Sequence, residues 1–106
     1  DHVIDYTAGD FRDEVLKLTN GRGVDRVYDP VGGEVFAQSL RCMAVEGRIC
    51  PIGFAGGTIP QIPANILLVK SIAVMGFNYG YYVGWRRELR VLCARWWARP
   101  EFGAAG

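Results

Sequence analysis

Apolar and polar positions alternate along the chain in a way that predicts helices and strands in turn. Phe11, Val15 and Leu18 recur at i, i+4 and i+7, which places them on one face of an amphipathic helix that Asp10 caps and Asn20-Gly21 closes. Residues 24–29 follow as a short run with β-branched and aromatic side chains, which favours a buried strand. A helix followed by a strand is therefore the first predicted unit.

The same reasoning predicts further elements along the chain. Strands that alternate with helices imply a mainly parallel sheet with right-handed crossovers and helices on both faces, so the predicted fold class is α/β. The remaining predicted elements are a strand at residues 2–6, a helix at 34–44, a turn at 46–47, a strand at 48–52, a loop at 53–63, a helical turn at 65–70, a strand at 72–77 and a helix over 85–99.

Three of the predicted strands end in glycine-rich stretches. Pro30 ends the strand at 24–29 because it has no N–H to donate, and Gly32 and Gly33 then allow a tight turn. Similar glycine-rich stretches follow the strands at 48–52 and 72–77. Parallel sheets bind ligands beyond the carboxyl ends of their strands, so we expect a binding site at this edge.

The length of 106 residues allows one small domain, which we place at residues 1–100, with 101–106 as a tail or linker. Its core must be small, so its margin of stability is expected to be thin. No apolar run approaches the roughly 18 residues that a membrane-spanning helix needs. We therefore expect a cytoplasmic protein without a membrane partner.

The chain has few residues suited to metal binding or catalysis. It contains three cysteines, none in C-x-x-C spacing, and a single histidine. We interpret the cysteines as reduced thiols in the core, and we predict no metal site. The single histidine has no neighbouring residues in the sequence that indicate a Ser-His-Asp catalytic triad. No residue is therefore assigned a catalytic role.

Charge is concentrated near the carboxyl end of the chain. Residues 85–99 carry a net charge of +4, whereas the rest of the chain sums to −3. Basic stretches with tryptophans can bind anionic membranes or nucleic acid. The favoured interpretation is a helix that packs its Trp and Leu face on the sheet and leaves its arginines in solvent, so nucleic acid is not an expected partner.

Three stretches together resemble one protein family. They are residues 1–6 (DHVIDY), 23–33 (GVDRVYDPVGG) and 47–57 (GRICPIGFAGG), followed by residues 62–65 (IPAN). Their order and spacing resemble the quinone oxidoreductase branch of the medium-chain dehydrogenase/reductase superfamily, from Asp1 to about residue 80. The resemblance implies the later part of a Rossmann nucleotide domain, a partial Rossmann-like fold, whose cofactor is usually NADPH.

The resemblance also implies which residues would face a cofactor. Each retains a structural alternative, since Asp29 can form a turn with Pro30, residues 53–57 can be an ordinary loop, and residues 77–79 can be core and loop aromatics. The implied residues are Asp29, Val31 and Gly32 beside the cofactor, Gly53, Phe54 and Ala55 along the nicotinamide ribose, and Phe77, Asn78 and Tyr79 with backbone groups for the carboxamide.

The chain departs from the family at the phosphate site. It contains no G-x-G-x-x-G that opens a helix. We therefore predict a truncated piece or relative of a zinc-free, NADPH-dependent reductase, which contributes the nicotinamide side of the cleft and is inactive alone. The alternative is a small stand-alone α/β protein for assembly or partner binding, so whether the chain is itself an enzyme stays open.

Truncation would leave strands without their neighbours. In the usual order of such sheets, the strands at 2–6 and 24–29 both pair with strands that precede this chain. An exposed edge tends to pair with another strand. We therefore hypothesise a rearranged first strand or a homodimer, formed through the strand at 72–77 or the bare apolar edge at 24–29.

Overall fold

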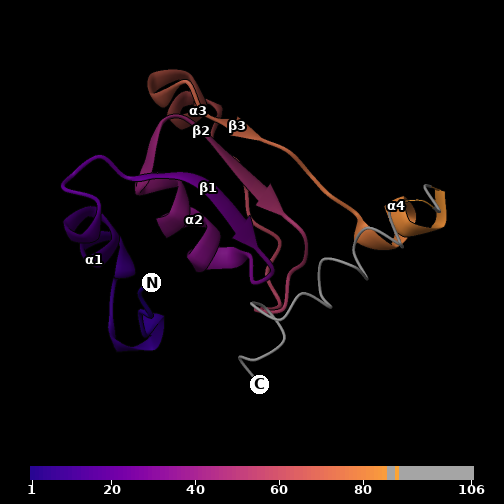
Figure 1. Ribbon diagram of the computed structural model, residues 1–106, viewed down its shortest axis with the longest axis horizontal. Helices are drawn as coiled ribbons and strands as arrows, with labels where there is room; N and C mark the ends of the chain where they lie inside the picture. The colour runs from indigo at the N-terminus through magenta and orange to yellow at the C-terminus, as the bar shows by residue number, and fades with distance from the viewer. Residues whose placement is uncertain (86–87, 89–106) are drawn as a thin grey trace.

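The structure, a computed structural model, describes residues 1–85 and residue 88. Most of the helix predicted over 85–99, together with Cys93 and the tail at 101–106, lies outside these residues. The elements in chain order are the 3-10 helix η1 (Tyr6–Ala8), α1 (Phe11–Leu18), β1 (Val24–Asp29), α2 (Gly33–Arg41), β2 (Met43–Pro51), α3 (Ala64–Lys70), β3 (Ala73–Val74) and α4 (Tyr79–Trp85) (Figure 1).

The three strands form a parallel sheet in the order β1-β2-β3. Tyr28 lies opposite Cys50, and Ile49 lies opposite Val74. Helix α2 connects β1 to β2 and α3 connects β2 to β3, as parallel neighbours require. The α/β, partial Rossmann-like fold is confirmed, and β1 and β3 are the two edge strands of the described sheet.

The strand predicted at residues 2–6 is wrong. The chain there has no sheet partner, Val3 is fully exposed, and η1 begins at Tyr6. The Asp5 carboxylate accepts a hydrogen bond from the Thr7 backbone N–H at 2.9 Å. Short polar side chains of this kind can hydrogen-bond the nearby backbone in place of a neighbouring strand. Because no strand lies beside these residues, the local hydrogen bond forms instead of a sheet ladder.

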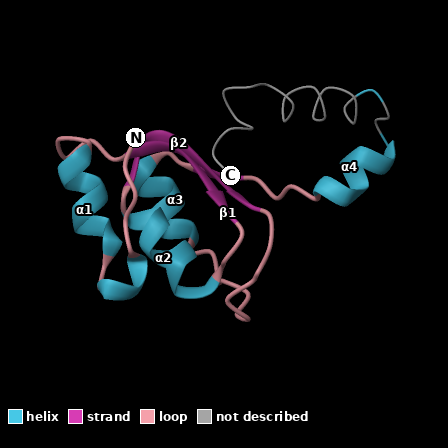
Figure 2. Cartoon of the chain, turned by 60° about the horizontal axis from the view of Figure 1, so that its bottom comes forward, coloured by secondary structure: helices cyan, strands magenta, loops and turns pink. Residues whose placement is uncertain are grey.

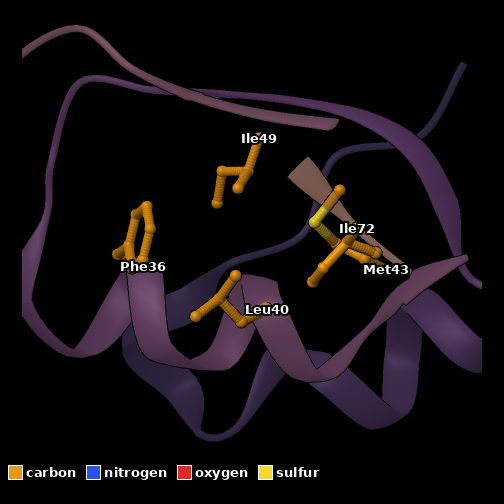
Figure 3. Close-up of a cluster of buried hydrophobic side chains, with 5 residues drawn as sticks. All are labelled: Phe36, Leu40, Met43, Ile49 and Ile72. Carbon is orange, nitrogen blue, oxygen red and sulfur yellow. The ribbon is translucent and has the colours of Figure 1, made fainter. Parts of the chain in front are cut away.

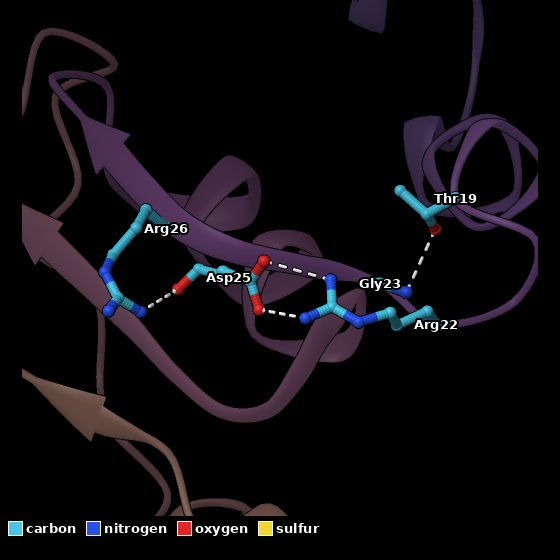
Figure 4. A network of polar contacts seen from close by, with 5 residues as sticks. All are labelled: Thr19, Arg22, Gly23, Asp25 and Arg26. Atoms are coloured by element: carbon cyan, nitrogen blue, oxygen red, sulfur yellow. Dashed lines mark hydrogen bonds and ion pairs between the residues drawn. The ribbon is translucent and has the colours of Figure 1, made fainter.

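Helix α1 and the turn into β1 follow the predicted signals. The Asp10 carboxylate accepts from the Arg12 N–H at 2.8 Å and caps the helix. Beyond the helix, the Thr19 hydroxyl accepts from the Gly23 N–H at 2.9 Å, and the Arg22 guanidinium donates to both oxygens of Asp25 (Figure 4). These contacts fix the point at which β1 begins.

Strand β2 is longer than predicted, and α2 is correspondingly shorter. Helix α2 ends at Arg41, so the helix predicted through residue 44 overran into β2. The turn expected at residues 46–47 lies inside this strand, where Glu46 has φ of 63° and the register against β1 shifts. Residues 43 and 44 are apolar, which fits a helix face and a buried strand equally well.

Strand β3 is shorter than the strand predicted at residues 72–77. The ladder covers Ala73–Val74, but the chain continues beside β2, since Met75 N–H donates to Ile49 O at 3.0 Å and Phe77 N–H to Pro51 O at 3.4 Å. The helical turn predicted at 65–70 is confirmed as α3. None of the described helices is long and apolar enough to span a membrane.

The buried core lies between the sheet and helices α2 and α3. Partly buried Val27, Ile66, Leu67 and Val74 surround it. Its centre is formed by Phe36, Leu40, Met43, Ile49 and Ile72 (Figure 3).

The described helices α1, α2 and α3 lie on one side of the sheet (Figure 2). Successive strand side chains point to opposite faces, and the residues opposite the core face, among them Arg26, Tyr28 and Arg48, are exposed. The helix predicted over 85–99, which we expect to pack on the sheet, lies outside the described residues.

Candidate functional site

The loop after β1 is organised by Asp29. This residue is 2% exposed, and its carboxylate accepts hydrogen bonds from the Val31 N–H at 2.8 Å and the Gly32 N–H at 3.1 Å. Those are the bonds of an Asx turn, in which an acidic side chain stands in for a backbone carbonyl. The Asp29 carboxylate therefore holds the shape of its own loop.

The loops after β1 and β2 are joined through their main chains. Ile52 N–H donates to Asp29 O at 2.9 Å, and Ala55 N–H donates to Pro30 O at 2.9 Å. A third bond, from Gly56 N–H to Val31 O, measures 3.0 Å. Six of the nine predicted site residues lie on these two loops, so the sheet brings them together at its carboxyl edge as expected.

Two glycines allow this close approach. Gly32 has φ of 78°, and a Cβ there would lie 2.9 Å from Thr58 O and 3.0 Å from the Phe54 ring. A Cβ at Gly53 would lie 3.3 Å from Pro30 O. Loop–loop packing therefore accounts for glycine at both positions without a ligand.

A groove of about 600 Å³ opens between the end of β2 and the segment that follows β3. Its volume falls in the range of small-molecule and cofactor sites. Gly53, Phe54, Phe77, Asn78 and Tyr79 line it, five of the nine predicted site residues. The other lining residues, which the sequence analysis missed, are Pro51, Ile52, Gly76 and Gly80.

The four remaining predicted residues lie outside the groove lining. Asp29, Val31, Gly32 and Ala55 belong to the joined loops that support one wall. The missed residues lie within two positions of the predicted stretches, so widening those stretches by two residues at each end would have found them.

The described part of the groove wall is uncharged and mainly apolar. Among the residues that the structure describes, its lining contains no Asp, Glu, Lys, Arg or His. The Phe77 and Tyr79 rings lie 6.5 Å apart between centroids, and 45% of Phe54 is exposed. Such a wall suits a flat, weakly polar ring better than a phosphate group, which needs cations or clustered N–H groups.

Two polar groups near the groove already have partners. The Asn78 side-chain oxygen accepts from the Tyr81 N–H at 3.1 Å, which caps the start of α4. The Phe77 N–H donates to Pro51 O. A ligand carboxamide would have to compete with Pro51 O for the Phe77 N–H. At least one of the backbone groups implied by the resemblance is therefore already hydrogen-bonded.

The sequence profile of a family described as "Zinc-binding dehydrogenase" matches residues 1–94. The chain belongs to this family. Among similar curated members, "Quinone oxidoreductase-like protein 2 homolog" of Nematostella vectensis is 52% identical over 78 residues, which are 74% of this chain and 21% of that protein. The "Quinone oxidoreductase-like protein 2" of Bos taurus is 47% identical over 79 residues, 74% of this chain and 23% of that protein.

Solved structures of dehydrogenase-family members share the fold. A quinone oxidoreductase of Pseudomonas syringae pv. tomato DC3000 superposes with a TM-score of 0.68 at 33% identity, covering 76% of this chain and 25% of that one. The Escherichia coli quinone oxidoreductase complexed with NADPH gives 0.69 at 29% identity, covering 77% and 26%. These matches confirm the quinone oxidoreductase-like branch, and the chain spans about a quarter of their length.

The zinc in the family description has no evident ligand set in the described part of this family member. No group of three His, Cys, Asp or Glu side chains lies close enough there to hold a metal ion. Cys42 is buried in the core, and burial raises the pKa of its thiol, which disfavours the thiolate that zinc requires. The described residues thus do not fit a zinc site.

Proposed function

We propose that this chain forms the nicotinamide side of an NADPH cleft in a zinc-free, quinone oxidoreductase-like reductase. The observation that carries the proposal is the groove lined by Gly53, Phe54, Phe77, Asn78 and Tyr79 at the carboxyl edge of the sheet. Its position agrees with the rule for ligands in parallel sheets, and its uncharged aromatic wall suits a nicotinamide ring. The NADPH-bound Escherichia coli relative supports the choice of cofactor.

Within this proposal, Gly53 and Phe54 contact the nicotinamide ribose, Ala55 adjoins them outside the groove lining, and residues 77–79 contact the carboxamide. Asp29, Val31 and Gly32 act differently. Their hydrogen bonds to each other and to residues 52–56 hold the wall on which Gly53 and Phe54 sit. A nicotinamide cofactor supplies hydride chemistry when bound, and the protein supplies binding and orientation.

The proposal is tested with the two halves of the cofactor given separately. We expect reduced nicotinamide mononucleotide to shift the amide NMR signals of the groove with millimolar affinity, about 4 kcal/mol of binding free energy. We expect adenosine bisphosphate to leave them unchanged. Shifts with the adenosine half only, or none with either half, would contradict the proposal.

A glycine pair provides a matched test of the groove. A Cβ at Gly76, in the groove lining, or at Gly84, outside it, would meet no other atom within 4 Å. Gly76→Val is expected to weaken binding of the nicotinamide half, because the side chain occupies space at the groove. Gly84→Val is expected to bind the nicotinamide half with the affinity of the parent. If both variants bind it equally well, the ligand lies outside the groove.

Reductase activity is not expected from this chain alone. Hydride transfer needs the substrate held in a near-attack position, and the described residues contain neither a phosphate-anchoring loop nor a second domain to do so. We expect NADPH oxidation with a quinone to proceed at the uncatalysed rate. Turnover above that rate that persists through repurification would show that the chain is an enzyme by itself.

The alternative of an assembly protein rests on the two edge strands. Tyr28 beside the β1 edge is 66% exposed, and Met75 after β3 is 57% exposed. If two copies join through residues 72–77, Met75→Lys should dissociate the dimer. If they join through Val24–Asp29, Tyr28→Lys should dissociate it. Sedimentation equilibrium measures both. A dimer without nicotinamide affinity would favour assembly over the cofactor role.

A further inference from the structure

A second, smaller pocket lies among α1, α2 and α3. It shares no lining residue with the groove and has a volume of about 250 Å³. Its lining residues are Arg12, Arg41, Asn65, Ile66, Val69 and Lys70.

Three cationic side chains line the pocket, although most of its exposed lining is apolar. Arg12 comes from the first turn of α1, Arg41 is the last residue of α2 and Lys70 is the last residue of α3. Among the described residues, no Asp or Glu lines the pocket. The ion pair nearest to it joins Arg12 to Asp13 at 3.7 Å, and the Asp13 side chain is 82% exposed, so this contact neutralises little charge.

Helix termini account for part of this arrangement. Lys70 Nζ donates to Arg41 O at 2.8 Å and to Leu40 O at 3.5 Å, which satisfies carbonyls at the end of α2. Cations are favourable at the carboxyl end of a helix. That effect explains Arg41 and Lys70 individually, but it does not explain why Arg12, from the amino end of α1, joins them around a hollow.

Arg12 also has a donor that lacks an acceptor. Its Nε is buried and makes no hydrogen bond in the structure. A buried donor left unpaired costs free energy, and more when the group is charged. An oxyanion in the pocket would supply acceptor oxygens among the three cations.

The surroundings of Cys42 support the convergence of two of these cations. Burial raises the pKa of the Cys42 thiol, the charges of Lys70 and Arg12 lower it, and the charge of Asp10 raises it by the smallest of these effects. Two cations from different helices therefore act on the same small region of the molecule.

We propose that the pocket binds a phosphoryl group, either as inorganic phosphate or as a phosphomonoester. Arg12 and Arg41 supply planar guanidinium donors, Lys70 supplies its remaining ammonium N–H, and the Asn65 amide completes the polar lining. Ile66 and Val69 give the body of a phosphomonoester an apolar surface to contact.

The test is an NMR titration of the whole chain with inorganic phosphate, at ionic strength held constant with chloride. We expect saturable shifts of the Arg12 Nε–H signal and of the amides of residues 65–70, without shifts at the groove. Phenyl phosphate identifies the source, because tighter binding than phosphate indicates a phosphomonoester and equal binding indicates the free anion. Absence of saturation, or the same shifts with chloride alone, overturns the proposal.

Matched variants separate specific binding from general charge. Arg41→Gln removes one lining cation and should weaken phosphate binding by about tenfold, the scale of one charge-assisted hydrogen bond. Arg48→Gln makes the same change at an exposed residue outside the pocket lining and should not alter the affinity. Arg12→Lys retains the charge but removes Nε, and should also weaken binding. Equal affinities in all variants would contradict the assignment.

Discussion

At the scale of single residues, Asp29 shows how a buried charge can serve a loop. The residue is 2% exposed, and its carboxylate accepts hydrogen bonds from two backbone N–H groups of the following residues. Burial of an ionised group is costly unless hydrogen bonds compensate it, and here the loop itself provides them. The turn thus positions Gly53 and Phe54 indirectly, through the bonds that join the two loops.

Asp29→Ala should lower the free energy of unfolding by about 2–4 kcal/mol, because two N–H groups lose a charged acceptor. The control is Asp25→Ala in the same strand. Asp25 pairs with Arg22 at the surface, and that bond lowers the pKa of the Asp25 carboxyl, but an exposed pair contributes little to stability because solvent screens it. Urea denaturation measures both, and equal losses would mean that the Asp29 turn is not the source of stability.

Cys42 provides a prediction about pH. Burial raises the pKa of its thiol above the ordinary value of 9.0, so the folded chain holds this proton more tightly than the unfolded chain does. The contribution of the protonated Cys42 thiol to the free energy of unfolding is complete below pH 9.0. It is lost as pH rises through the folded-state pKa of the thiol. Denaturation midpoints of the parent should therefore fall more steeply above that pH than those of Cys42→Ala. Parallel curves would assign the alkaline loss to other groups.

At the scale of elements, β1 and β2 begin together because of Gly23. Its φ is 87°, and a Cβ would lie 2.6 Å from Cys42 O, where Val24 N–H donates at 3.0 Å to start the ladder. Glycine is thus required both by the backbone conformation and by the approach of the next strand.

A pair of glycine variants separates these two effects. Gly21→Ala should cost about 1 kcal/mol, because φ is 80° there but a Cβ would meet nothing within 4 Å. Gly23→Ala adds the backbone clash and should cost at least about 2 kcal/mol. Urea denaturation gives the difference, and the same cost at both positions would mean that the strands move apart freely.

The hydrophobic pattern predicts elements well where local signals agree. Helix α1 has both a cap and an apolar face, and β1 ends at a proline, so both were predicted where they are observed. The strand at 2–6 failed because pairing depends on a partner that no local pattern reveals. At the site, the family resemblance, and not a local pattern, implied the five lining residues. Asp29 instead belongs to the supporting wall, because hydrogen bonds between loops are not visible in a linear pattern.

At the scale of the whole molecule, the cofactor proposal depends on whether so small a core holds the sheet edge in place. Five buried side chains form its centre, and helices α1, α2 and α3 lie on one side of the sheet. A domain of this length has about 5–15 kcal/mol of stability at most. Because helices α1, α2 and α3 cover only one face of the sheet, we expect the described residues to contribute stability at the lower end of that range.

The core is tested with two leucines in adjacent elements. Leu40 is 1% exposed in α2, and Leu68 is 81% exposed in α3. Leu40→Ala should cost about 2–5 kcal/mol, because it removes buried methyl groups and leaves a cavity, and a large fraction of the chain should then unfold. Leu68→Ala should change the free energy of unfolding by less than about 0.5 kcal/mol. If circular dichroism and urea denaturation find both variants equally stable, the packing of α2 on the sheet is not what holds the groove open. If Leu40→Ala alone unfolds, this core is what keeps the carboxyl edge of the sheet ordered for a ligand.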